Sequence, residues 1–171
     1  MSETDIRNKV EESGLVQIDL ETLIDIPLLQ PFDLANYLYE GLVLREKPFR
    51  EALNALDAEN FFGQNVALHC SSDAILPLWS WMLAAMRLED FKAHVHYGTP
   101  EEVSKNLYLR ALDNINWSQY AQSRVIVKGC SENIPLAAYV VLVQKLKPLV
   151  KTLMFGEACS AVPLYKTPSK S

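Results

Sequence analysis

The chain has 171 residues, of which 49% are hydrophobic and 22% charged, a composition typical of one soluble globular domain. Its formal net charge of -5 disfavours nucleic acid and anionic membrane surfaces as partners, since both attract basic faces. No run approaches the roughly 18 apolar residues that cross a bilayer, and the N-terminus lacks the basic and apolar regions of a secretory signal. We therefore expect a cytoplasmic protein that binds neither nucleic acid nor membrane.

The first 60 residues predict a segment that covers a sheet face or an edge. A polar helix is expected over 3–12 and a small apolar piece over 15–20. Pro27 and Pro31 then interrupt any long element. A helix over 46–56 with one apolar stripe completes this N-terminal covering segment, 1–60.

Beyond residue 65 the pattern alternates between short apolar strands and helices. Strands are predicted over 66–69, 92–97, 124–128 and 152–155. Helices are predicted over 74–88, 99–114 and 134–146, the second opened by a capping box in Thr99-Pro100-Glu101-Glu102. The alternation predicts an α/β fold with a mostly parallel sheet of four to five strands and helices on both faces.

We expect residues 1–171 to form a single α/β domain, with a βα-repeat core over 65–166 and a frayed tail over 167–171. If the sheet is doubly wound, its first three strands lie in the order second, first, third, and the fourth follows outside the third. Ligands then bind at the carboxyl ends of the strands, between those that end at His69 and Lys128. Lys128 is therefore a candidate contact for an anion or a substrate.

Three cysteines, each just past an apolar strand and each followed by a serine, are the most distinctive feature: Cys70-Ser71, Cys130-Ser131 and Cys159-Ser160. An odd number of cysteines without an export signal indicates thiols or ligands rather than a disulfide framework. The expected strand order places the three cysteine-bearing strands side by side. Because neighbouring strands lie about 4.8 Å apart, the thiols could converge within roughly 10 Å.

One interpretation of this pattern is a metal site. Zinc, iron or an iron–sulfur cluster suits a thiolate-rich set formed by Cys70, Cys130 and Cys159. The candidates for a fourth ligand are His69, Asp73 and Glu157. Ser71, Ser131 and Ser160 would then donate hydrogen bonds to the sulfur atoms.

Three other interpretations stay open. Cys70 could be the nucleophile of a small thiol-dependent enzyme, activated by the following helix N-terminus and assisted by Asp73 or His69. The cysteines could form a redox or persulfide-carrying set. They could also pack as small hydrophobic residues in a structural or partner-binding domain, whose apolar helix over 74–88, with Trp79 and Trp81, would form a homo-oligomer contact.

A set of segments carries a resemblance to a known family: Gly41–Lys47 with Phe49-Arg50, His69–Ile75, Lys128–Cys130, and Phe155–Ser160 with Val162-Pro163. Together they resemble a bacterial family of unknown function, domain-of-unknown-function family 2480, from about residue 8 to Lys166. The main departure is Ala158, where the family has proline.

The resemblance implies no established activity, and it leaves open whether the chain is an enzyme. Members of the family are encoded beside sulfur-mobilisation genes for iron–sulfur cluster assembly. The resemblance thus implies an accessory factor in iron–sulfur cluster or sulfur metabolism, with iron–sulfur assembly proteins as partners. The small thiol-dependent enzyme and the structural domain with buried cysteines are the alternatives.

Overall fold

A computed structural model describes residues 14–129, 134–157 and 160–168 of the chain. The chain divides into two compact units, which we call the terminal unit (residues 1–25 with 108–171) and the central unit (residues 26–107). Helix α5 (Pro100–Asp113) crosses the boundary between the units, with residues 100–107 in the central unit and residues 108–113 in the terminal unit. The expected helix over 3–12 lies outside the described residues, and a single domain stays a prediction. Within the described ranges, no helix has both the length and the apolar character needed to cross a bilayer.

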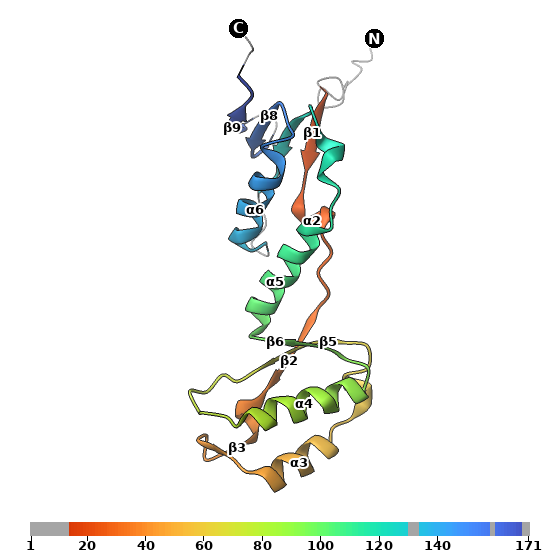
Figure 1. The fold of residues 1–171 in the computed structure, drawn as a ribbon, viewed down its shortest axis with the longest axis vertical. Helices are drawn as coiled ribbons and strands as arrows, with labels where there is room; N and C mark the ends of the chain where they lie inside the picture. The colour runs from red at the N-terminus through yellow and green to blue at the C-terminus, as the bar shows by residue number, and fades with distance from the viewer. Residues whose placement is uncertain (1–13, 130–133, 158–159, 169–171) are drawn as a thin grey trace, which may run out of the picture. The chain divides into compact units, whose positions relative to one another are not determined.

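The terminal unit contains a mixed four-stranded sheet, in which one strand departs from the expected parallel direction (Figure 1). Its strands lie in the order β1 (Leu15–Ile18), β7 (Arg124–Val127), β8 (Thr152–Phe155) and β9 (Val162–Lys166). The first three are parallel, whereas β9 runs antiparallel to β8. The short connection between β8 and β9 explains this difference, because a parallel return requires a crossover of a dozen or more residues.

Helix α6 (Leu136–Leu146) connects β7 to β8 and packs on one face of this sheet. The ring of Tyr139 on the helix meets the ring of Phe155 on β8 edge-on, with their centroids 6.1 Å apart. Ala138, Leu142 and Leu146 are fully buried at a spacing of four residues, which places them on one side of the helix. The short helix α2 (Leu20–Leu23) and the 3-10 helix η3 (Trp117–Tyr120) complete the unit.

The central unit contains a three-stranded parallel sheet in the order β2 (Leu29–Asp33), β5 (Asn65–His69) and β6 (His94–Tyr97). Helices α3 (Glu46–Asn54) and α4 (Leu78–Asp90) lie on the same side of it (Figure 1). The three strands lie in the sheet in the same order as in the sequence. Successive right-handed crossovers in one direction place their helices on the same face of the sheet. The hairpin β3 (Leu38–Tyr39) and β4 (Val43–Leu44), with η1 (Leu34–Tyr37) and η2 (Ala58–Asn60), fill the connections.

The expected order of one continuous sheet is wrong. Strand β5 pairs with β2 on one side and with β6 on the other, so neither of its edges is open to β7. Strand β7 likewise pairs with β1 and β8. Strands β1 and β2 of the N-terminal segment pair with β7 and β5, respectively. Strands β5 and β7, which end near His69 and Lys128, are therefore not neighbours in one sheet as the expected order required.

The two tryptophans of α4 pack against aromatic residues of the central unit. Trp79 lies against Phe49 of α3 and Trp81 against Tyr97 of β6, with ring centroids 6.2 Å and 5.4 Å apart, respectively. Both are half-buried packing residues of the central unit. The exposed apolar residues of this helix are Leu78, Met82 and Met86, again at a spacing of four residues. A homo-oligomer through this helix stays a prediction.

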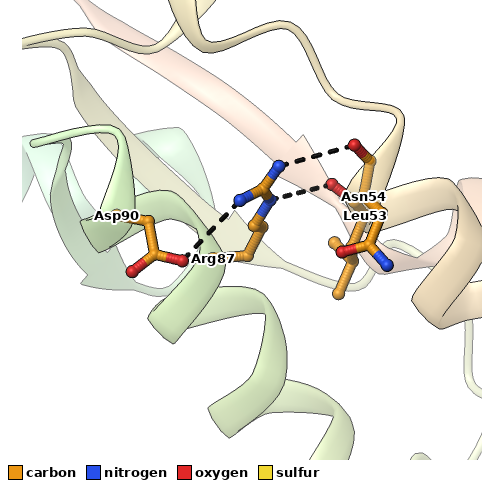
Figure 2. A network of polar contacts seen from close by, with 4 residues as sticks. All are labelled: Leu53, Asn54, Arg87 and Asp90. Atoms are coloured by element: carbon orange, nitrogen blue, oxygen red, sulfur yellow. Dashed lines mark hydrogen bonds and ion pairs between the residues drawn. The ribbon is translucent and has the colours of Figure 1, made fainter.

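Arg87 joins α4 to the end of α3 (Figure 2). Its guanidinium donates hydrogen bonds to the carbonyl oxygens of Leu53 (3.1 Å) and Asn54 (3.4 Å). The last carbonyls of a helix have no partner within the helix, and a cation there also offsets the negative end of the helix dipole. Asp90, 3.7 Å from the guanidinium, holds the side chain on its other side. Arg87 therefore connects α4 to the end of α3, and these two helices cover the β2–β5–β6 sheet.

We expect Arg87→Ala to lower the free energy of unfolding by about 1–3 kcal/mol, because two carbonyl oxygens lose a charged donor. Arg87→Lys should recover part of this loss, since an ammonium group keeps the charge but not the planar fork. The matched control is Arg50→Ala, which removes only an exposed pair with Glu46 and should change stability by less than about 0.5 kcal/mol. Urea unfolding measures all three; an equal loss in the Arg50 and Arg87 variants would contradict this role.

Candidate functional site

The predicted site residues are divided between the two units. Cys70, with His69, Ser71 and Asp73, follows β5 in the central unit. Lys128 follows β7, and Glu157 and Ser160 follow β8, in the terminal unit. Cys130, Ser131 and Cys159 lie outside the described residues, so the structure places only the residues that flank them.

The strands that lead to Cys130 and Cys159 are direct neighbours. Val127 and Phe155, the last residues of β7 and β8, pair across the parallel ladder. The backbone N–H of Gly156 then donates a hydrogen bond to the Val127 carbonyl (2.9 Å), which continues the ladder past the strand. The expected adjacency is thus confirmed for β7 and β8. The chain leaves these two strands at points about 4.8 Å apart.

The backbone before Cys130 is closely packed. The ring of Phe155 lies directly over Gly129, so a Cβ atom at this position would collide with the ring. On the other side, the backbone N–H of Lys128 donates a hydrogen bond to the Ile18 carbonyl at the end of β1 (2.8 Å). A side chain at 129 would therefore require the Phe155 ring to move.

Polar groups of the chain lie around this edge of the sheet. Lys128 is half-buried, and Glu157 and Ser160 are exposed. The N–H of Ser160 donates a hydrogen bond to the Glu157 carbonyl (2.9 Å). One cation, one carboxylate and one hydroxyl thus flank the two cysteine segments.

At the corresponding edge of the central unit, a carboxylate clamps the Cys70 segment. Asp33, the last residue of β2, accepts hydrogen bonds from the Ser71 N–H (3.0 Å) and the Ser71 hydroxyl (2.6 Å). It also accepts one from the N–H of Ala35 (2.9 Å) and so caps η1. The residue after Cys70 is therefore tied to the end of the neighbouring strand through both its backbone and its side chain.

The surroundings of Asp33 favour its charged form. Burial raises the pKa of the carboxyl, but the hydrogen bonds from Ser71 and Ala35 and the nearby imidazole of His69 outweigh this effect, so the pKa lies below its usual value. The Nδ1 atom of His69 is buried and has no hydrogen-bond partner in the part of the chain that the structure describes. A buried ring nitrogen without a partner is uncommon and leaves one bond available.

Cys70 is partly a packing residue. Its side chain is half-buried against the apolar core of the central unit. Its thiol lies 3.6 Å from the Ser72 carbonyl oxygen, within the range of a weak S–H hydrogen bond. Asp73, a predicted ligand, is exposed. Within residues 14–129, 134–157 and 160–168, no group of three or more histidine, cysteine and acidic side chains could hold a metal.

Sequence reasoning missed Asp33 as part of this region. An aspartate at the end of a short apolar run, two residues before the N–H that it caps, is a recognisable helix-start signal. Its second role, as the partner of Ser71, depends on the pairing of β2 with β5, which places Asp33 opposite His69. Local sequence does not encode this pairing.

Asp33→Asn tests the clamp through its dependence on pH. The folded protein binds a proton at this carboxyl less readily than the unfolded chain, so the charged form stabilises the fold above the unfolded pKa of about 3.9. This stability is lost as the pH falls through the lowered folded pKa. The variant should therefore unfold at lower urea than the wild type at neutral pH, and the difference should shrink in acid. The matched control, Asp57→Asn, alters a cap with a single hydrogen bond, from Glu59. A difference that is the same at every pH would contradict the clamp.

Comparison with known proteins agrees with the resemblance seen in the sequence. A family model described as "Protein of unknown function (DUF2480)" matches residues 4–167. Neither the curated proteins nor the solved structures that were searched contain a match to this chain. Since the family model covers nearly the whole chain, the chain belongs to the DUF2480 family.

Proposed function

We propose that this chain binds a metal ion, an iron–sulfur cluster or a sulfur species through Cys130 and Cys159, with Cys70 as a third thiol. The observation that carries this proposal is the pairing of β7 with β8, because the two cysteine segments follow the carboxyl ends of neighbouring parallel strands. Parallel sheets bind their ligands at this edge, where the loops that follow the strands meet.

The chemistry of the flanking residues suits this role. Thiolates are the preferred ligands of zinc and iron–sulfur clusters. The exposed Glu157 carboxylate, two residues before Cys159, is a candidate further ligand. Lys128, two residues before Cys130, would favour the thiolate form through its positive charge. Ser131 and Ser160 are candidate donors of hydrogen bonds to the sulfur atoms.

Cys70 has a different position in this proposal. It follows a strand of the other sheet, and the Asp33–Ser71 clamp holds the residue next to it. The unpartnered Nδ1 atom of His69 and the exposed Asp73 carboxylate remain proposed ligands beside it. A three-cysteine site needs Cys70 to bind the same ion as Cys130 and Cys159, whereas a two-cysteine site does not.

The biological role that we propose is that of an accessory factor in iron–sulfur cluster or sulfur metabolism. Its partners would be iron–sulfur assembly proteins, and its location the cytoplasm. This part of the proposal rests on the implied association of the family with sulfur mobilisation and on thiol chemistry.

The test is metal and sulfide analysis, with a visible spectrum and an intact mass, of untagged full-length chain purified without air. We expect iron or zinc in stoichiometric amount, or a mass increment of bound sulfur. Cys130→Ser and Cys159→Ser should each lose it, because each variant removes one of the proposed ligands. The Arg50→Ala protein is the control and should keep it. Metal-free wild type with an unmodified mass would overturn the proposal.

The Cys70→Ser variant decides the number of thiols. Loss of the metal in this variant supports the three-cysteine site, while retention with loss in the other two variants limits the site to Cys130 and Cys159. Either result keeps the binding role of the terminal unit, which the two other variants test.

A thiol-dependent enzyme that uses Cys70 is the second candidate. The favouring observation is that Cys70 lies between a histidine with an unpartnered buried nitrogen and a serine held by a carboxylate. This candidate predicts one cysteine, Cys70, that iodoacetamide alkylates much faster than the others at neutral pH. The metal proposal predicts instead that Cys130 and Cys159 become reactive only after a chelator removes the ion.

A further inference from the structure

A pocket of the central unit combines one arginine with an aromatic wall. It has a volume of about 320 Å³, within the range of about 300–1,000 Å³ that is usual for small-molecule sites. Its lining comes from η1, from β3 and from the start and one side of α3. The lining includes Asn36, Tyr37, Tyr39, Arg45, Phe49 and Ala52.

The β3–β4 hairpin places the arginine on a tyrosine ring. The N–H of Leu42 donates a hydrogen bond to the Tyr39 carbonyl (3.1 Å), and β4 then runs back beside β3. Arg45 follows β4 directly, and its guanidinium carbon lies 3.3 Å from the centre of the Tyr39 ring. A planar guanidinium that lies on a ring has its N–H groups at its edge, where they remain accessible to a ligand.

The charge of the pocket suits a monoanion. Within the described part of the chain, the guanidinium of Arg45 contacts the Tyr39 ring and forms no hydrogen bond or ion pair. The acidic residue next to it, Glu46, is paired with Arg50 instead (2.9 Å). The lining holds one cation and no acidic side chain. The fork of one arginine matches the two oxygen atoms and the single charge of a carboxylate, whereas a phosphate group carries a charge closer to two.

The aromatic wall indicates the rest of the ligand. The ring of Tyr37 contacts the rings of Phe32 and Phe49, with centroids 5.5 Å and 5.4 Å away, respectively. Burial raises the pKa of Tyr37, so its hydroxyl is neutral at physiological pH and does not repel an anion. Aromatic rings that are held in this way favour a second ring that packs edge-on or in an offset stack.

We propose that this pocket binds a small aromatic carboxylate, with its carboxylate on the edge of the Arg45 guanidinium and its ring against Tyr37 and Phe49. The exposed amide of Asn36 offers a donor and an acceptor to a polar substituent of the ligand. No residue of the pocket lining belongs to the proposed thiol site. The two proposals are therefore independent of each other.

The test is isothermal titration calorimetry of the full-length chain at low ionic strength with phenylacetate, phenylacetamide and acetate. We expect phenylacetate to bind at least about tenfold more tightly than either of the others, because the amide lacks the charge and acetate lacks the ring. Absence of phenylacetate binding, or equal binding of phenylacetate and its amide, would overturn the proposal.

A charge variant shows whether Arg45 binds the carboxylate. Arg45→Gln should weaken phenylacetate binding by about tenfold or more and remove the preference for the acid over the amide. The matched control is Lys47→Gln, which removes the same charge from an exposed neighbour outside the lining. An equal loss in both variants would show a general charge effect and contradict the site.

A steric variant tests the place of the ring separately. Ala52→Leu adds a larger side chain to the lining and should weaken phenylacetate binding by about tenfold or more, because it occupies space that the ligand needs. Glu51→Leu, a substitution at an exposed position of the same helix outside the lining, is the control and should keep the binding. Unchanged affinity in the Ala52 variant would contradict binding in this pocket.

Discussion

A β-strand has only two hydrogen-bonding edges, and the structure of this chain depends on how those of β5 and β7 are filled. Strand β2 takes one edge of β5, and β1 takes one edge of β7. The other edges are taken by β6 and β8. Because buried backbone groups must be paired, these four pairings leave no place for β5 beside β7. The chain therefore builds two parallel arrays, each with its own carboxyl edge.

This division separates the strand that precedes Cys70 from the two strands that precede Cys130 and Cys159. The segments of Cys130 and Cys159 leave one edge from neighbouring strands, with Gly129 locked beneath Phe155. Cys70 leaves the other edge, where Asp33 holds the following serine through two hydrogen bonds and keeps its own pKa low. The pairing of β7 with β8 is the observation on which the proposed ligand of Cys130 and Cys159 rests. The third thiol lies in a separate polar arrangement, with a buried histidine nitrogen beside it.

Much of the local structure could be predicted from the sequence, but the pairing of strands could not. The four predicted strands appear as β5 to β8, and the predicted capping box is confirmed, with Glu102 accepting from Thr99 N–H (2.9 Å) and donating its own N–H to the Thr99 hydroxyl (3.2 Å). These features depend on residues close in sequence. Strands β2 and β9 contain proline, which weakens their strand pattern in the sequence. The partners of β1 and β2 are far away in the sequence, and the Asp33 clamp follows from the pairing of β2 with β5.

The central claim is that Cys130 and Cys159 lie close enough to share one ligand. A trivalent arsenical tests it directly, because one arsenic atom bridges two thiols only when they can approach each other. Metal-free Cys70→Ser protein would be titrated with phenylarsine oxide and its intact mass measured. The account predicts one tightly bound arsenical per chain, with both remaining thiols protected from alkylation until a dithiol removes it. Two freely alkylated thiols in the presence of excess arsenical would contradict the account.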